Sequence, residues 1–106
     1  MTYQGYNWEL KIKRQLQKDG WIVFKCSRRS YCDFVAISPD ISWKDVKLIE
    51  CKSRKDKWYM KPREVRQAHL LMELHEKGFA VEYHIKVKDK VEILTIEEFF
   101  EKYMNE

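Results

Sequence analysis

The sequence predicts a mixed α/β domain in which a central sheet of about five strands is flanked by helices. Its 106 residues, 44% of them hydrophobic, are enough for one compact core and too few for two. Helix-like and strand-like segments alternate in the order α, β, β, β, α, β, β, α. No repeat, low-complexity tract or linker divides the chain. We therefore expect residues 1–106 to form a single domain.

The first half of the chain begins with an expected helix and continues as a hairpin. The helix is predicted from Asn7, as its N-cap, to about residue 18, with Gly20 just beyond its end. Residues 21–26 and 31–37 are rich in β-branched and aromatic side chains and flank the short basic turn SRRS. Turn residues at 38–45 then lead into a strand at 46–52.

The second half is expected to supply one long helix, two more strands and a last helix. Proline at position 62 suits the first turn of a helix that reaches residue 77, and Gly78 follows it. Strand-like residues at 79–94 turn near Asp89 and Lys90. Thr95 and Glu98 have the spacing of a capping box, which predicts a final helix to about residue 104.

Charge is distributed unevenly and indicates a phosphate-rich partner. Residues 11–66 contain 16 Lys and Arg against 7 Asp and Glu, whereas the rest contains 5 against 10. A basic half of this kind is typical of proteins that bind nucleic acid. There is no membrane-length apolar run and no signal peptide, so we expect a soluble, cytoplasmic protein without a membrane partner. The three cysteines, at positions 26, 32 and 51, do not form a CxxC motif, and we expect them to be buried, reduced thiols.

Two acids interrupt strand faces that are otherwise apolar. Alternation along LIECKSR (48–54) places Leu48, Glu50 and Lys52 on one face. If strands 33–37 and 46–52 form an antiparallel hairpin, paired positions sum to about 83, and Asp33 lies opposite Glu50. Two carboxylates at such a short distance repel each other, so we expect a cation between them.

Two carboxylates placed in this way indicate a magnesium site. Asp33 and Glu50 supply oxygen ligands for Mg²⁺, for which Mn²⁺ can substitute, and the carbonyl of Cys51 is a candidate further ligand. Lys52 is expected to orient or help deprotonate a water molecule. Glu9 shares or flanks the apolar stripe of the first helix and can add a third acid if that helix docks over this end of the sheet. Such a group suits phosphodiester hydrolysis.

A competing acid, Asp40, follows Pro39 and also precedes the Glu50-Cys51-Lys52 string. In the hairpin register it lies in the turn, about 23 Å of strand away from Glu50. We therefore prefer Asp33 as the metal ligand and assign Asp40 to turn capping.

Basic side chains cluster in the two loops beside this predicted site and are expected to contact the DNA backbone. Trp58 and Tyr59 are candidates either for stacking on exposed bases or for core and subunit packing. The expected DNA-binding residues are Lys25, Arg28, Arg29, Ser30, Arg54, Lys55, Lys57 and Lys61.

Several motifs between residues 5 and 85 resemble the PD-(D/E)XK nuclease superfamily and, within it, the archaeal Holliday junction resolvases. The resemblance rests on the Gly5-to-Glu9 spacing, Asp19-Gly20-Trp21, Asp33-Phe34-Val35-Ala36 and Glu50-Cys51-Lys52. The chain departs from the family pattern at Cys32, where the superfamily name has proline, at Lys25, where arginine is usual, and at Arg28-Arg29, where a small Gly-Ser turn is usual.

The resemblance implies a restriction-endonuclease-like fold and metal-dependent DNA cleavage with Glu9, Asp33, Glu50 and Lys52 as the catalytic set. Gln67 resembles the polar helix residue that supports such sites. The first function expected is a Holliday junction resolvase of an archaeal cell or a virus-infected archaeal host. The alternatives are another nuclease of the superfamily, acting in repair, restriction or viral recombination, and a catalytically silent DNA-binding protein.

A homodimer is also expected, because paired incisions at a four-way junction need two sites and a small domain supplies one. The helix at 62–77 gives a further hint, since its apolar arc is wide enough to cover the sheet and leave a strip for a partner. That arc contains Leu70, Leu71, Met72 and Leu74.

Overall fold

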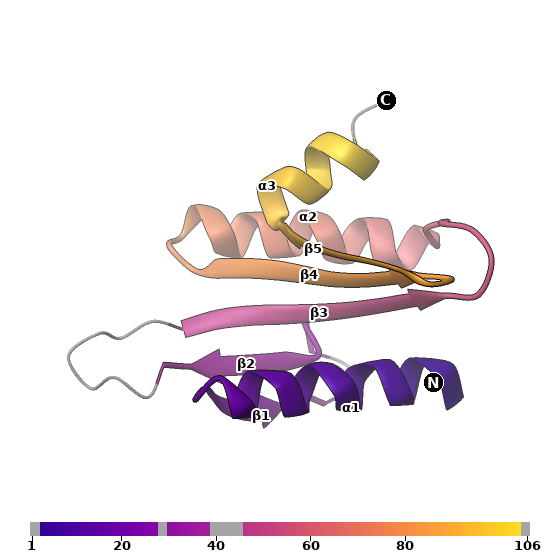
Figure 1. The fold of residues 1–106 in the computed structure, drawn as a ribbon. Helices are drawn as coiled ribbons and strands as arrows, with labels where there is room; N and C mark the ends of the chain where they lie inside the picture. Colours follow the sequence, from indigo (N-terminus) through magenta and orange to yellow (C-terminus); the bar gives the residue numbers. More distant parts are fainter. Residues whose placement is uncertain (1–2, 28–29, 39–45, 105–106) are drawn as a thin grey trace.

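Five strands form one mixed sheet in the computed structural model, which describes residues 3–27, 30–38 and 46–104. The strand order within these ranges is β1-β2-β3-β4-β5 (Figure 1). This architecture confirms the predicted fold class. In chain order the elements are α1 (Tyr3–Lys18), β1 (Ile22–Lys25), β2 (Phe34–Ile37), β3 (Val46–Arg54), α2 (Pro62–Glu76), β4 (Ala80–Val87), β5 (Lys90–Thr95), α3 (Ile96–Phe99) and the π-helical turn η1 (Phe100–Met104).

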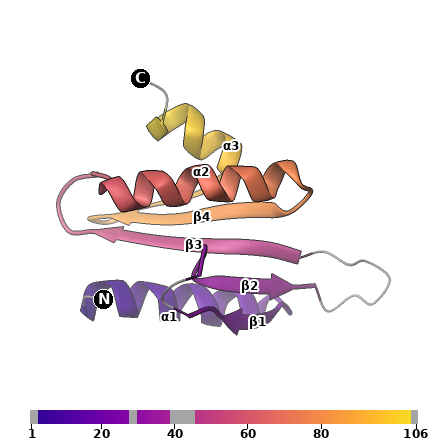
Figure 2. The same cartoon turned by 180° about the vertical axis from the view of Figure 1, so that it is seen from behind.

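The helices lie on both faces of the sheet. Figures 1 and 2 view the molecule from opposite sides: α1 is in front of the sheet in the first and behind it in the second, and α2 is placed the other way round. Side chains alternate along each strand, so each face has its own apolar core. None of the helices described is long and apolar enough to cross a membrane.

Helix α1 begins at Tyr3, so the prediction that Asn7 is its N-cap is wrong. Its buried side chains Trp8, Ile12 and Leu16 recur every four residues and therefore form one stripe. This stripe packs against Phe34, Ala36 and Ile49 of the sheet. The end of the helix is as predicted, because Gly20 follows it with a φ of 97°, a conformation that glycine adopts without strain.

The hairpin register derived from the sequence is confirmed. Strands β2 and β3 are antiparallel, with Val35 opposite Leu48 and Ile37 opposite Val46. The turn that joins them, including the competing acid Asp40, lies outside the described residues. Strand β4 then runs parallel to β3 from Lys47–Ala80 to Arg54–Val87, because α2 carries the chain back across the sheet.

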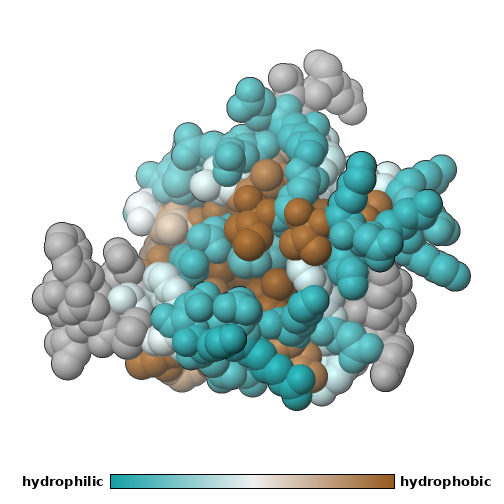
Figure 3. Space-filling view, in the orientation of Figure 1, coloured by the Kyte–Doolittle hydropathy of each residue, from teal (hydrophilic) through white to brown (hydrophobic). Residues whose placement is uncertain are grey.

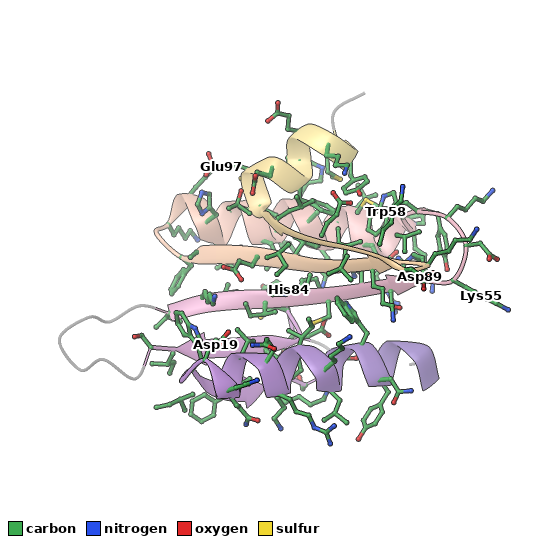
Figure 4. All side chains as sticks on the ribbon, viewed as in Figure 1. Asp19, Lys55, Trp58, His84, Asp89 and Glu97 are labelled. Carbon is green, nitrogen blue, oxygen red and sulfur yellow. The ribbon has the colours of Figure 1, made fainter. Side chains whose placement is uncertain are left out.

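The core beneath α2 is rich in aromatic rings. Tyr83 of β4 stacks on Phe99 with ring centroids 3.8 Å apart, and Trp58 packs against Tyr103 at 4.6 Å. Trp58 therefore packs with the core residues of the C-terminal helix, one of the two roles considered for it (Figure 4). The predicted capping box is confirmed, since the Glu98 amide donates to Thr95 Oγ1 and the Thr95 amide donates to Glu98.

A buried ion pair joins the end of β3 to the start of α2. Arg54 Nη2 donates to both carboxylate oxygens of Glu64 at 2.7 Å, and Lys52 Nζ lies 3.1 Å from Glu64 Oε2. Glu64 also accepts a hydrogen bond from the Lys61 amide, which closes the first turn of α2. Burial alone would raise the pKa of Glu64, but the Lys61 amide, Arg54 and Lys52 together lower it to about 2.

We expect Glu64→Ala to destabilise the fold by about 3–5 kcal/mol at pH 7, because Arg54 would stay buried without its counterion. The pKa of Glu64 is lowered from 4.5 to about 2, so its stabilisation is complete above pH 4.5 and is lost as the pH falls towards 2. The difference between wild type and variant should therefore shrink over that interval. Urea unfolding from pH 7 to pH 3 measures both effects.

The matched control for this experiment is Glu73→Ala, because Glu73 is an exposed acid on the same helix. Its effect should stay within about 0.5 kcal/mol at every pH. A Glu64 variant as stable as wild type would contradict a structural role for the pair.

Candidate active site

Asp33 lies at the entrance to β2, held by both neighbouring strands. Its amide donates to the Ile49 carbonyl, and its own carbonyl accepts from the Cys26 amide, each at 2.9 Å. The carboxylate oxygen Oδ2 accepts from the Cys51 amide at 2.7 Å. The side chain is therefore fixed against the part of β3 that carries Glu50.

Glu50 and Lys52 form a buried ion pair on the sheet face that α2 covers. Lys52 Nζ is 2.7 Å from Glu50 Oε2, and the two residues are 8% and 3% exposed. The structure thus brings together three of the four predicted catalytic residues, Asp33, Glu50 and Lys52.

The Glu50 carboxylate is only partly neutralised. Its second oxygen, Oε1, is buried and has no hydrogen-bond partner among the described residues. Burial raises the pKa of Glu50 to about 8; Lys52 opposes this shift and the nearby Asp33 carboxylate adds to it. A group of this kind gains stability from a proton or from a further cation.

Lys52 is the centre of a network that reaches α2. Besides Glu50 and Glu64, its ammonium contacts Gln67 Oε1 at 3.1 Å, and Gln67 Nε2 donates to the Tyr31 carbonyl at 2.9 Å. Burial lowers the pKa of Lys52, but its two carboxylate partners outweigh burial, so the pKa lies above its ordinary value. Gln67 therefore lies where a supporting residue is expected, and Lys52 remains positively charged.

Glu64 was not predicted from the sequence to lie near the site. Its signal is local: it occupies the third position of a helix that starts at Pro62. The position suggests a capping acid, and only the tertiary structure shows that the same carboxylate neutralises Lys52 and Arg54.

Glu9 approaches from the other face of the sheet. It is 7% exposed on α1, and its Oε1 accepts from Lys25 Nζ at 2.9 Å. Its charge acts on the Cys51 thiol, whose pKa is raised by burial first and then by Asp33, Glu50 and Glu9. Helix α1 therefore docks over these strands as expected, while the carboxylate of Glu9 is paired with Lys25.

The donor set fits a cation at Asp33 and Glu50, because their two carboxylates lie together and Glu50 Oε1 is buried with no hydrogen-bond partner in residues 3–27, 30–38 and 46–104. Over the described residues, no group of three or more His, Cys, Asp or Glu is arranged to hold a metal ion. Two of the predicted acids have lysine partners instead, Lys25 at Glu9 and Lys52 at Glu50.

The predicted DNA-binding residues fall into three groups. Lys25, Ser30, Lys55, Lys57 and Lys61 are exposed, and Lys55 points outward from the loop after β3 (Figure 4). Arg28 and Arg29 lie outside the described residues. Arg54 was wrongly predicted to be a surface contact: its guanidinium is buried, paired with Glu64 and packed against the Tyr59 ring at 4.4 Å.

The sequence matches no protein-family model and no curated protein. Among solved structures, the fold is similar to that of Hjc, a Holliday junction resolvase from the archaeal hyperthermophile Archaeoglobus fulgidus. The TM-score is 0.64 and the sequence identity 21%, over 88% of this chain and 73% of that one. The likeness to archaeal Holliday junction resolvases expected from the sequence motifs is thus confirmed at the level of the fold.

Proposed function

We propose that this chain is a metal-dependent DNA endonuclease whose substrate is the four-way junction. One observation supports the chemistry above all: the Glu50 carboxylate lies between the Lys52 ammonium and the Asp33 carboxylate, and its buried Oε1 has no hydrogen-bond partner among the described residues. The similarity in fold to a Holliday junction resolvase supports the choice of substrate. The same resemblance supports a cytoplasmic enzyme of an archaeal cell or a virus-infected archaeal host.

Asp33 and Glu50 are the residues that we propose to hold Mg²⁺ or Mn²⁺, with the Cys51 carbonyl and Glu9 as further candidates. Bound Mg²⁺ supplies Lewis-acid activation for phosphodiester hydrolysis. Glu9 Oε1 is paired with Lys25, so this ion pair has to open or be shared with the metal when Glu9 joins the group. The Asp33 carboxylate is held next to Glu50 by the hydrogen bond that its Oδ2 accepts from the Cys51 amide.

Lys52 acts in this proposal as a fixed positive charge. Its pKa is raised by Glu50 and Glu64, so it keeps its proton and can donate a hydrogen bond to a water molecule or a phosphate oxygen. Two roles were considered for Lys52, orienting a water molecule and helping to remove its proton. A charged ammonium fits the first role better. Gln67 and Glu64 act as positioning residues, since they hold the ammonium from the side of α2.

The exposed lysines around the site are proposed to bind the DNA backbone. Three of them, Lys55, Lys57 and Lys61, follow the end of β3. The fourth, Lys25, is the last residue of β1 and pairs with Glu9 of α1. Arg28, Arg29 and Ser30 belong to the same proposed surface by their position in the sequence. Backbone contacts of this kind give affinity without base specificity, which suits recognition of DNA shape.

We expect purified protein to cut a four-way junction in Mg²⁺ or Mn²⁺ and to be inactive in excess EDTA or with Ca²⁺ alone. Calcium binds oxygen ligands but is larger and holds them less rigidly. The assay compares a junction, a flap, a single strand and a linear duplex of the same sequence. Cleavage in EDTA would exclude the metal mechanism, whereas metal-dependent cleavage of the flap or duplex in preference to the junction would indicate a different nuclease.

We expect Asp33→Ala, Glu50→Ala and Lys52→Ala each to lower the single-turnover cleavage rate by about 100-fold or more, because each removes a group at the reaction centre. Junction binding in Ca²⁺ should stay within about threefold of wild type, since the exposed lysines supply most of the affinity. Glu9→Ala is expected to have a similar or milder effect on the rate.

The matched control for these variants is Glu82→Ala, which removes a half-buried acid that pairs with Lys47 on the opposite face. Its cleavage rate should stay near that of wild type. Full activity in the Asp33 variant, with normal folding, would contradict the assignment of the site.

We also propose that the protein is a two-fold homodimer, and we revise the surface involved. Leu71 is buried, and Met72 and Leu74 pack against the core, so of the apolar arc on α2 only Leu70 is well exposed. A clearer apolar surface is formed by Val91 and Ile93 of β5, which are 53% and 60% exposed. Figure 3 shows this hydrophobic surface over β5, surrounded by polar side chains.

Sedimentation at micromolar concentration should give twice the chain mass of 13.0 kDa. Ile93→Glu should produce a monomer, because a buried unpaired charge opposes association, while Leu70→Glu should leave the dimer intact. A wild-type protein that is active on junctions as a monomer would contradict the symmetric arrangement.

A further inference from the structure

Two of the three cysteines face each other across the turn between β1 and β2. The Sγ atoms of Cys26 and Cys32 are 3.9 Å apart. Cys26 is half-buried directly after β1, and Cys32 is buried directly before Asp33. Cys51 packs against the separate core under α1. The fold therefore pairs two particular thiols and keeps the third apart.

Backbone hydrogen bonds hold the segments that carry this pair. The Cys26 amide donates to the Asp33 carbonyl at 2.9 Å, which joins the two ends of the turn, and within the turn the Ser30 amide donates to the Ser27 carbonyl at 3.1 Å. A disulfide requires sulfur atoms about 2.0 Å apart and cysteines on closely neighbouring segments. Rotation of the two side chains can close the remaining gap. The weak hydrogen bond from Cys32 Sγ to the Phe34 carbonyl, 3.3 Å long, would be given up.

We propose that Cys26 and Cys32 are a reversible redox pair, which a small disulfide such as oxidised glutathione converts to an intramolecular disulfide. Cys26, the more exposed thiol, attacks one glutathione sulfur as the thiolate, forming a mixed disulfide and releasing one glutathione. Cys32 then loses its proton and attacks the Cys26 sulfur, which releases the second glutathione. Two electrons pass from the cysteine pair to the oxidant, and two glutathione thiols are formed.

This pair adds a property that the proposed nuclease activity does not require. The new bond would join the residue after β1 to the residue before Asp33, so it ties the turn at the edge of the candidate site. In a reducing environment the pair stays as thiols. Oxidation would therefore form a covalent bond at one defined position, next to the residues that we propose to catalyse DNA cleavage.

The test treats native wild-type protein with oxidised glutathione, then denatures it in acid and alkylates the remaining thiols. Intact mass spectrometry should show alkylated thiols falling from three to one, and peptide mapping should place the remaining one at Cys51. Before alkylation the mass should be about 2 Da below that of the reduced protein. Dithiothreitol should restore three thiols.

Three variants make the assignment specific. Cys51→Ser should still form the disulfide and lose both of its thiols, whereas Cys26→Ser and Cys32→Ser should form no intramolecular bond. A wild-type protein that keeps three alkylated thiols, holds glutathione as a stable adduct, or forms a bond through Cys51 would overturn the proposal. The readout is independent of cleavage, so it stands apart from the test of the nuclease.

Discussion

The buried ion pairs between β3 and Glu64 of α2 are the interaction on which the rest of the structure depends. Strand alternation places Glu50, Lys52 and Arg54 on one face, and α2 covers that face. Burying such charges is costly unless each has a partner with good geometry. Glu64 provides that geometry, because one carboxylate accepts both bonds from Arg54 and also contacts Lys52. Helix α2 is thereby anchored at its first turn.

From this anchor the candidate site is assembled outward. Lys52 is held by carboxylates on two sides and by Gln67, and Gln67 in turn holds the Tyr31 carbonyl just before Asp33. The network thus links α2, β3 and the start of β2. The same arrangement leaves Glu50 with one buried oxygen that has no hydrogen-bond partner within the described part of the chain. A buried charge that lacks part of its hydrogen bonding lowers the stability of the fold, and such features are expected at functional sites.

The two faces of the sheet contribute differently. The α2 face holds the charged network and a ring cluster around Tyr83 and Phe99, and the α1 face holds a smaller core around Trp8 and Ile49. Glu9 belongs to this second face, where Lys25 neutralises it. Its helix nevertheless crosses the same strands that carry Asp33 and Glu50. The charges of both Glu9 and Asp33 act on Lys25, and all three acids act on the Cys51 thiol. The side chains of Lys25 and Lys52 form the ion pairs with Glu9 and Glu50.

The sequence by itself determined the order of the elements and the register of the β2–β3 hairpin. These features depend on short-range rules: side-chain alternation, capping residues and turn residues. Only the tertiary structure decided that Arg54 is buried, that Glu64 neutralises it, that Glu9 pairs with Lys25 and that Cys26 meets Cys32. Each of these contacts depends on how α1, α2 and the strands pack in three dimensions. No local sequence pattern specifies which of the many charged side chains becomes the partner of a buried one.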